Sequence, residues 1–469
     1  MTTAKTLFST ALLTAPFICS IQASERPNVI IIYNDDMGYQ DLGCYGAPKI
    51  KTPRVDQLAK EGVRLTDFYS TSPVSSASRA SLLTGCYPQR VGVKGVFFPG
   101  NNPALKPEHV TMAEVLKSVG YKTAAVGKWH LGDLPQFLPT NQGFDSYFGI
   151  PFSNDMYPSK ETKYSDSCKW LNGYSPDSLK KVSLLEINTK ELKSLKNLVP
   201  LFRGNECVEF PTDQTTITKR YASEGINFIE KSVAEKKPFF LYLANSMPHI
   251  PLFVSPEFKG KSQQGLYGDV IEEIDFNTGR ILDKLKELGI EKNTIVIFAS
   301  DNGPWLEFKE HAGAALPLYE GKFTCFDGGV RVPCIVKWPK QIPAGKTSSV
   351  LTSTIDILPT LAAITGAKLP DIEIDGTDIL KVLKGKIKDK SPHDYFFFVY
   401  DAQAVRSGDW KYHKNRRYTT TKNIKMEEIP ALYNLKDDIG ETNNLIEKEP
   451  EIAARLAKAL DEHLKRLKK

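Results

Sequence analysis

Apolar residues occur along the chain in uninterrupted runs that alternate with stretches of helical spacing. Runs without a polar residue at every second position are typical of strands buried on both faces of a sheet. Such runs predict strands at 28–33, 122–126, 238–244, 294–299 and 333–338. Helical spacing predicts helices at 51–60, 111–118, 215–231, 267–288 and 353–364. This alternation indicates an α/β protein with a doubly wound, mostly parallel sheet.

Three stretches depart from that pattern. Residues 64–69 alternate apolar and polar positions and predict a shorter strand. Residues 157–211 are rich in Lys and Ser without clear periodicity, which predicts an irregular surface insertion. Near the C-terminus, short runs at 394–400, 403–406 and 410–413 predict antiparallel strands, with a helix within 444–468. The sequence therefore predicts a main domain over 24–388 and a small α+β domain over 389–469.

The first 23 residues differ from the rest of the chain. They carry a lone Lys5, then an apolar stretch, and end at the small residue Ala23. This order is typical of a secretory signal peptide, whereas Pro16 argues against a buried helix. No other segment is long and apolar enough to cross a membrane. We therefore expect the protein to be exported, to a periplasm or to the outside of the cell.

Composition adds two constraints. The 469-residue chain has a formal charge of +6, which falls to about +5 without the predicted leader. This mild positive charge is compatible with a polyanionic substrate but is weak evidence for one. It has no zinc-finger spacing, no basic helix and no interleaved basic and aromatic residues, so a nucleic-acid partner is not expected.

Of the cysteines beyond the leader, Cys168 and Cys207 both fall in the irregular insertion. We expect them to pair in an oxidising compartment.

Polar side chains follow the predicted strands at the points where these strands end. Each cluster alone is equally typical of a solvated turn or a packed side chain. The carboxyl ends of parallel strands, however, meet at one edge of the sheet, where ligands bind in open α/β sheets. The clusters therefore predict one site built from Asp35, Asp36, Lys128, His130, His249, Asp301 and Asn302.

Within this set, the side chains of Asp35, Asp36, Asp301 and Asn302 offer oxygen ligands. An oxygen set with three carboxylates favours calcium or magnesium over zinc. Basic side chains at Arg79, Lys128 and Lys322 would surround the remaining oxygens of a bound anion with fixed donors. The set thus predicts a hard cation and an anionic group at one centre.

Ser75 lies in a Ser-rich stretch before a predicted helix start near Ala80, where free N–H groups favour an anion. A plain helix cap would have the same local sequence. The spacing Ser75-x-Ala77-Ser78-Arg79, followed by Leu83-Thr84-Gly85, resembles the signature of the type I sulfatases. In that family a Cys or Ser at the first position is oxidised to formylglycine. Ser at this position is similar to the bacterial serine-type members, although Ala77 replaces their commoner Pro.

Further motifs carry the same resemblance. They are Asn34-Asp35-Asp36-Met37-Gly38, Gly127-Lys128-Trp129-His130-Leu131-Gly132, Pro248-His249, Asp301-Asn302-Gly303, Gly321-Lys322 and Gly328-Gly329-Val330-Arg331. Asp327 stands where the family more often has Glu. The chain looks most similar to the group of arylsulfatase A and N-acetylgalactosamine-6-sulfatase.

The resemblance implies an alkaline-phosphatase-like fold and a sulfuric ester hydrolase that acts on a sulfated carbohydrate. It implies one calcium ion, with Asp35, Asp36, Ser75, Asp301 and Asn302 as ligands. By the same resemblance Arg79 and His130 would stabilise the formylglycine, Lys128, Ser153 and Lys322 would bind sulfate, and His249 would protonate the leaving oxygen. A formylglycine-generating maturation enzyme is the implied partner.

Two alternatives stay open. One is a phosphomonoesterase or phosphodiesterase of the same superfamily that uses an unmodified Ser75. The other is a sulfated-glycan-binding protein without catalysis. The loop between Asn302 and Lys322 is expected to place Trp305 and His311 near the sugar, although a tryptophan there is as typical of simple packing.

Overall fold

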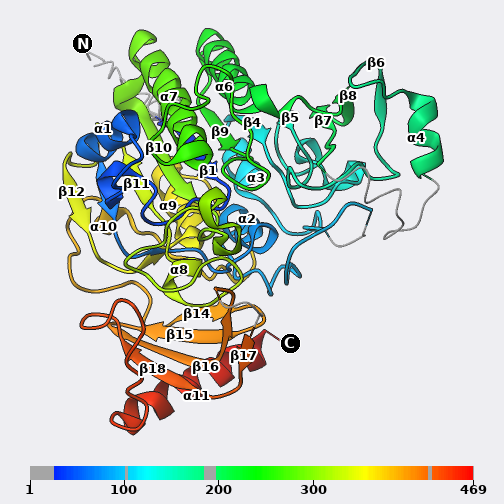
Figure 1. Ribbon diagram of the computed structural model, residues 1–469. Helices are drawn as coiled ribbons and strands as arrows, with labels where there is room; N and C mark the ends of the chain where they lie inside the picture. Colours follow the sequence, from blue (N-terminus) through cyan, green and yellow to red (C-terminus); the bar gives the residue numbers. More distant parts are fainter. Residues whose placement is uncertain (1–25, 101–103, 184–196, 421–424, 468–469) are drawn as a thin grey trace, which may run out of the picture.

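The computed structural model describes residues 26–100, 104–183, 197–420 and 425–467, so the predicted leader lies outside the described residues. Within these ranges, an 11-stranded sheet forms the centre of the molecule (Figure 1). Its strand order is β12 (Lys346–Ser348), β2 (Val63–Leu65), β11 (Cys334–Lys337), β10 (Thr294–Ser300), β1 (Asn28–Asn34), β9 (Phe239–Ala244), β4 (Lys122–Gly127), β5 (Ser146–Gly149), β7 (Leu201–Arg203), β8 (Glu206–Phe210) and β6 (Tyr164–Trp170).

The middle of the sheet is parallel. Strands β10, β1, β9, β4 and β5 all run in one direction. The predicted strand at 333–338 is present as β11 but pairs antiparallel with β10, and β2 is antiparallel to β11 in turn. An apolar run predicts burial on both faces but carries no information on direction, which explains why sequence left this orientation unassigned. The expected mostly parallel α/β sheet is confirmed.

Helices cover both faces of the sheet. On one face lie α1 (Pro53–Glu61), α6 (Ile217–Ala234) and α7 (Gly265–Glu287), with α6 and α7 side by side (Figure 1). On the other lie α2 (Ser75–Thr84), α3 (Met112–Lys117), α9 (Ile357–Thr365) and α10 (Leu380–Leu383). Strand β1 contributes side chains to both hydrophobic cores: Ile30 packs on the face covered by the first group of helices, and Ile31 packs on the face covered by the second. The two hydrophobic cores therefore meet at the central strand.

Short 3-10 turns join these elements. They are η2 (Gly43–Tyr45), η3 (Pro135–Phe137), η4 (Pro139–Asn141), η5 (Gln214–Thr216), η6 (Glu291–Asn293), η7 (Leu306–His311) and η8 (Thr354–Asp356). None of the helices among the described residues is both long and apolar enough to span a membrane.

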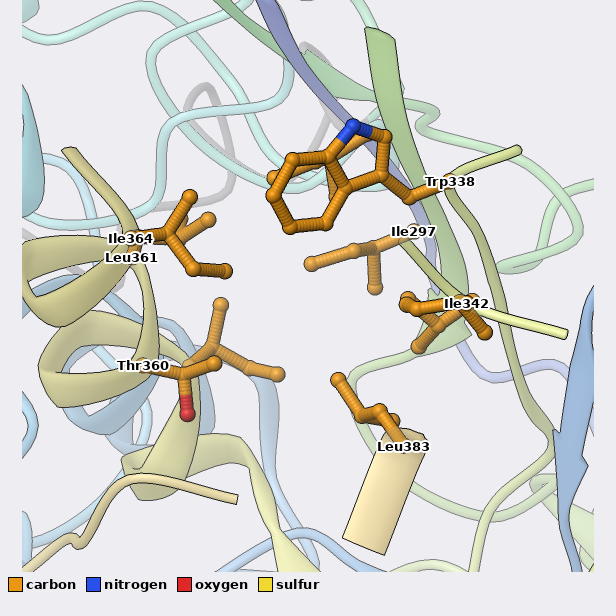
Figure 2. A pocket seen from close by; sticks show the side chains of 10 residues that line it. Ile297, Trp338, Ile342, Thr360, Leu361, Ile364 and Leu383 are labelled. Carbon is orange, nitrogen blue, oxygen red and sulfur yellow. The ribbon is translucent and has the colours of Figure 1, made fainter. Parts of the chain in front are cut away.

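The layer between β10, β11, α9 and α10 contains an apolar cavity (Figure 2). It is lined by Ile295, Ile297, Val336, Trp338, Ile342, Ile357, Thr360, Leu361, Ile364 and Leu383. The hydroxyl of Thr360 donates to the carbonyl of Asp356 at 2.6 Å. Ile295 and Ile297 belong to the first half of β10, away from the strand end where the polar clusters lie. We read the cavity as a packing gap rather than a substrate site.

Two sequence expectations need correction. The predicted strand at 64–69 is broken at Thr66–Asp67 into β2 and β3 (Phe68–Tyr69), and β3 pairs with β13 (Thr352–Ser353). The insertion at 157–211 is not irregular: β6, β7 and β8 extend one edge of the main sheet, with α4 (Pro176–Ser183) beside them. Its strands are short and partly exposed, and their pairing is not visible from periodicity.

The two cysteines of this insertion lie on β6 and β8. The structure has both Cys168 and Cys207 as free thiols, so the expected disulfide is not present in it. Each thiol donates to a backbone carbonyl, Cys168 to that of Lys169 and Cys207 to that of Glu209, and burial raises the pKa of Cys207. The proximity was predicted from sequence context; the covalent bond was not found.

The C-terminal part forms a separate antiparallel sheet with one long helix against it (Figure 1). Its elements are β14 (Phe396–Val399), β15 (Gln403–Ser407), β16 (Trp410–Tyr418), β17 (Lys425–Glu427), β18 (Ala431–Asn434) and α11 (Pro450–Arg466). Helix α11 packs on β15 and β16 through Leu456 and Leu460. The expected small antiparallel sheet is confirmed, whereas the boundary at residue 389 stays a prediction.

A buried set of charges joins this sheet to the main one through the short helix α8 (Asp327–Val330). Lys411 Nζ lies 2.7 Å from Asp327 Oδ1 and 3.1 Å from Glu441 Oε1, and all three side chains are fully buried. Arg331 and Arg406 both pair with Asp67. We call these six residues the interdomain ion network: Asp67, Asp327, Arg331, Arg406, Lys411 and Glu441.

Candidate active site

The ends of β1 and β10 lie next to each other, because Asn34 pairs in register with Ser300. Asp35 and Asp36 follow the first strand, and Asp301 follows the second. Asp36 has a φ of 61°, in the left-handed region, which turns the chain so that adjacent carboxylates reach the same centre. Ligand oxygens of Asp35, Asp36 and Asp301 lie within 4.8 Å of one another, and all three side chains are buried. The predicted carboxylate cluster is thus assembled.

The donor set fits a hard cation. Asn302 donates its amide to Asp36 Oδ1 at 2.7 Å, while its own Oδ1 is buried with no hydrogen-bond partner among the described residues. Burial and the charge of Asp35 raise the pKa of Asp301 to about 7. Burial alone would also raise the pKa of Asp35, but the charges of Lys128 and other neighbouring cations hold it well below its ordinary value. Three converging carboxylates and an orphaned amide oxygen are ligands suited to calcium.

Ser75 lies at the first position of α2 rather than ahead of it. The helix begins five residues earlier than the expected start near Ala80. A backbone already helical at Ser75 points the side chain back along the helix axis. Its Oγ donates to Asp35 Oδ1 at 2.8 Å and lies 3.4 Å from Lys128 Nζ. The start of α2 therefore places the Ser75 hydroxyl beside the cluster of Asp35, Asp36 and Asp301.

Arg79 lies one turn further along α2 and is fully buried. Its Nη2 is 2.8 Å from Asp301 Oδ2 and 3.4 Å from Asp35 Oδ1. Its Nη1 donates to the carbonyl of Lys128 at 3.2 Å and to Tyr242 Oη at 3.4 Å. The planar guanidinium thus links two of the three carboxylates to the neighbouring strand.

Lys128 and His130 follow β4. Gly127 has a φ of 111°, and a Cβ there would lie 1.8 Å from the carbonyl oxygen of Ala244, so the turn requires glycine. Lys128 Nζ donates to Asp35 Oδ2, although burial lowers its pKa. His130 Nε2 lies 3.0 Å from the carbonyl of Phe97 and therefore carries the proton, which leaves Nδ1 an acceptor. Burial, with the charge of Lys128, holds the pKa of His130 well below its ordinary value, so the ring is neutral.

His249, Ser153 and Lys322 close the opposite side of the site. His249 Nδ1 donates to the carbonyl of Ile250 at 2.6 Å, so its Nε2 is the atom that faces Asp36 Oδ2 at 3.6 Å. Ser153 Oγ lies 3.3 Å from Lys128 Nζ and 3.3 Å from His249 Nε2. Lys322 Nζ lies 2.8 Å from Asp36 Oδ2. Burial and the Lys322 charge lower the pKa of His249, so this ring too is neutral at rest.

The two residues expected near a sugar have different surroundings. Trp305 is half-buried: Lys322 Nζ lies 4.4 Å from its ring centroid, and the His249 ring lies 5.5 Å away. His311 ends η7 with an exposed side chain, and in the part of the chain that the structure describes it has no hydrogen bond to the site. Trp305 therefore borders the site, whereas a role for either residue beside a sugar stays a prediction.

Sequence reasoning missed two partners that orient the site. Tyr242 lies in the middle of β9 and receives a hydrogen bond from Arg79. The carbonyl of Phe97, in a loop after α2, fixes the tautomer of His130. A tyrosine inside an apolar run is read as core, and a backbone carbonyl has no residue signature. Only the spatial arrangement could reveal either of them.

The site combines three carboxylates with three cations around one serine. It offers oxygen ligands for a metal on one side and, on the other, the ammonium groups of Lys128 and Lys322 with an imidazole. Fixed donors of this kind stabilise charge on a tetrahedral oxyanion, and a neutral imidazole can exchange a proton with a leaving oxygen. The arrangement suits cleavage of a tetrahedral anionic ester.

Comparison with known families agrees with this chemistry. Residues 27–367 match a family model described as Sulfatase. Residues 318–469 match a second model, described as N-sulphoglucosamine sulphohydrolase, C-terminal. The two matches together extend over the main sheet and the C-terminal sheet.

Among curated proteins, arylsulfatase A of Bos taurus is 36% identical over 470 residues, covering 96% of this chain and 89% of the relative. N-acetylgalactosamine-6-sulfatase of Rattus norvegicus is 37% identical, covering 83% of this chain and 72% of the relative.

Among solved structures, the PsFucS1 sulfatase from Pseudoalteromonas sp. has a TM-score of 0.80 and 30% identity, covering 95% of this chain and 91% of the other. Ps i-CgsB, solved in complex with k-i-k-neocarrahexaose, has a TM-score of 0.74 and 30% identity, covering 93% and 92%.

Proposed function

The chain belongs to the sulfatase family of sulfuric ester hydrolases, and from this premise we propose that it cleaves the sulfate ester of a carbohydrate. In this proposal Ser75, oxidised to formylglycine, provides the nucleophile, and one calcium ion is held by Asp35, Asp36, Asp301, Asn302 and residue 75. The observation that carries the proposal is the position of Ser75 Oγ, which lies 2.8 Å from Oδ1 of Asp35, one of the three converging carboxylates.

Oxidation of Ser75 to formylglycine would explain how this residue can act as a nucleophile. An ordinary serine hydroxyl is a weak nucleophile unless a base activates it. The two histidines of the site have other contacts, since His130 bonds the carbonyl of Phe97 and His249 the carbonyl of Ile250. A hydrated formylglycine would offer two hydroxyls on one carbon. One would attack sulfur as the bond between sulfur and the leaving alcohol oxygen breaks, and loss of the proton from the other would then reform the aldehyde and release sulfate. Calcium, when bound, offsets the charge of the sulfate oxygens.

The chain's own residues would divide the remaining work between binding and proton transfer. Lys128, Lys322 and the hydroxyl of Ser153 hold the sulfate oxygens that face away from the metal ligands. Arg79 and the free Nδ1 of His130 orient the oxygens of residue 75. His249 Nε2 gives a proton to the leaving alcohol, which then departs neutral. Because burial lowers the pKa of His249, binding of an anionic substrate next to it is what favours the protonated ring.

A sulfated carbohydrate is the proposed substrate class. Ps i-CgsB, which shares this fold at 30% identity, was solved with a neocarrahexaose. The name of the rat relative denotes action on a 6-sulfated N-acetylgalactosamine. We further propose export of the chain, as expected from residues 1–23, and a maturation enzyme that oxidises Ser75. The proposed substrate class, export and maturation are supported by membership of the sulfatase family and by the serine at the first position of α2.

The nucleophile can be tested by mass spectrometry of the tryptic peptide from Leu65 to Arg79. Enzyme made with a formylglycine-generating partner should show the loss of two hydrogens at Ser75 and should cleave p-nitrophenyl sulfate or a defined sulfated oligosaccharide. Protein made without the partner should be folded and inactive. Ser75→Ala should be inactive in both cases, whereas Ser81→Ala should be active, because Ser81 is a buried serine of the same helix that bonds Thr71 instead.

Two results would contradict the proposal. Active enzyme with an unmodified Ser75 and a preference for p-nitrophenyl phosphate would favour the phosphatase alternative. Normal turnover after exhaustive chelation would exclude the calcium ion. Calcium occupancy and turnover should instead fall together on chelation and in Asp301→Asn, since that substitution removes one of the three carboxylates from the cluster.

A further inference from the structure

Lys322 reaches the site from a segment with an unusual backbone. Glu320 and Phe323, on either side of it, have φ values of 60° and 71°, in the left-handed region that side chains other than glycine rarely adopt. A Cβ on Gly321 would lie 2.3 Å from the carbonyl oxygen of Pro304. Lys322 N donates to that same carbonyl at 2.9 Å. A strained segment of this kind persists only when its surroundings hold it in place.

The side chain of Glu320 shows what holds the segment. The residue is 2% exposed. Oε2 accepts hydrogen bonds from Thr419 N at 3.0 Å, Thr419 Oγ1 at 3.0 Å and Thr420 N at 3.2 Å, and Oε1 accepts one from Thr420 Oγ1 at 2.5 Å. No basic side chain of the described residues pairs with this carboxylate. We call this arrangement of Glu320 with Thr419 and Thr420 the Glu320 clamp.

A buried carboxylate without a counter-ion is costly unless its hydrogen bonds are satisfied. Here the donors are Thr419 and Thr420, directly after β16 of the C-terminal sheet and about 100 positions along the chain from Glu320. The clamp therefore fastens the C-terminal sheet to a segment only two residues from Lys322. This is a second attachment, separate from the interdomain ion network.

We infer that Glu320 is a positioning residue: the clamp fixes the backbone from which Lys322 reaches the sulfate. This inference rests on the proposed function, since it takes Lys322 as a sulfate-binding residue. Lys322 Nζ is already held near Asp36 and above the ring of Trp305. A shift of the Lys322 backbone would move its ammonium group relative to both Asp36 and Trp305. A displacement of about 1 Å at a binding group costs up to roughly 100-fold in reaction rate. The C-terminal sheet thus takes part in binding the reacting group without touching it.

The clamp can be opened without disturbing the core, because Thr420 is exposed. Thr420→Val removes the hydroxyl donor to Glu320 Oε1, whereas Thr420→Ser keeps it. Glu320→Ala removes the whole clamp. Glu320→Gln can preserve it, since its carbonyl accepts the bonds of Oε2 and its amide donates to the Thr420 hydroxyl. The matched control is Asp438→Ala: Asp438 accepts bonds from Thr442 N, Thr442 Oγ1 and Asn443 N in an exposed turn.

The measurement is the affinity of the full-length, matured protein for inorganic sulfate by calorimetry, together with kcat/KM. Glu320→Ala and Thr420→Val should weaken sulfate binding by about 10-fold or more. Thr420→Ser, Glu320→Gln and Asp438→Ala should stay within about twofold of wild type. Combined with Lys322→Ala, neither Glu320→Ala nor Thr420→Val should weaken binding further, since the group they position is then absent.

The outcomes separate the inference from the proposed function. If Lys322→Ala binds sulfate as tightly as wild type, the assignment of Lys322 under the proposed function is wrong. If Lys322→Ala weakens binding while Thr420→Val and Glu320→Ala lower only the unfolding midpoint, the clamp is structural and the inference is overturned. If Glu320→Ala does not fold, the pair Thr420→Val and Thr420→Ser decides alone. An equal loss in Thr420→Val with and without Lys322 would also overturn it.

Discussion

Replacing Lys411 by methionine should strongly destabilise the protein, because it unbalances the interdomain ion network. The network contains three carboxylates and three cations, each at most 6% exposed. Among the described residues, Lys411 alone bridges Asp327 and Glu441, with its Nζ 2.7 Å from Asp327 Oδ1 and 3.1 Å from Glu441 Oε1. Its removal leaves one surplus negative charge in the interior, and breaking a buried pair in this way costs about 3–5 kcal/mol. That is a large part of the roughly 5–15 kcal/mol by which folded proteins are stable.

The assay is urea denaturation followed by tryptophan fluorescence and circular dichroism, with Lys411→Met compared with wild type at pH 7. A second variant, Lys411→Met with Glu441→Gln, restores the balance of charge and should recover at least half of the lost stability. The matched control is Lys414→Met, on the same strand, whose pair with Asp461 is about half exposed. An exposed pair contributes about 0–1 kcal/mol. The reasoning is refuted if Lys411→Met costs no more than the control, or if the double variant is no more stable than Lys411→Met.

Three further predictions concern sites away from the catalytic centre. The His463 ring stacks on the Phe397 ring with 3.9 Å between their centroids, and burial lowers the pKa of His463 from 6.5 to about 4. As the pH falls, the unfolded chain therefore binds this proton before the folded one does. The free energy of unfolding should fall by up to about 3 kcal/mol between pH 6.5 and pH 4. In His463→Phe this part of the pH dependence of unfolding should disappear, and an unchanged curve would contradict it. Leu361→Ala should enlarge the cavity of Figure 2 and cost about 2–5 kcal/mol without changing kcat/KM; a loss below 1 kcal/mol in thermal or urea unfolding would argue against the packing role. Cys168 and Cys207 should both be found as free thiols, as they are in the structure, and non-reducing peptide mapping that finds them linked would contradict this.

Much of the site could be predicted because its residues follow strands. An apolar run that stops at Asp35 or at Asp301 marks both the strand and its end, and parallel strands bring their ends together. The structure brings Lys128 and His249 to that same edge, where both contact Ser153, and their roles stay a prediction. What the sequence could not show was the backbone turn at Asp36, whose left-handed φ depends on the packing around it.

Features that depend on partners distant in sequence were not predictable. The direction of β11 and the sheet within 157–211 depend on hydrogen bonds between strands, which leave no periodic trace in either strand alone. Glu320 reads as an ordinary surface glutamate before Gly321, and Thr419 and Thr420 as an ordinary strand end. Only the fold brings these three residues together. The helix start at Ser75 was placed too late because Ser is common at helix caps as well as inside first turns.

The burial of α2 has a consequence for the order of events in biosynthesis. All ten of its residues are buried, and Ser75 itself is 2% exposed. A second enzyme cannot take hold of that backbone once the helix has docked under the sheet. Under the proposed function, oxidation of Ser75 would therefore have to precede folding, on the nascent or still unfolded chain. If the proposal holds, maturation and folding would compete in time. A chain that folds first would then stay inactive, however much maturation enzyme is supplied later.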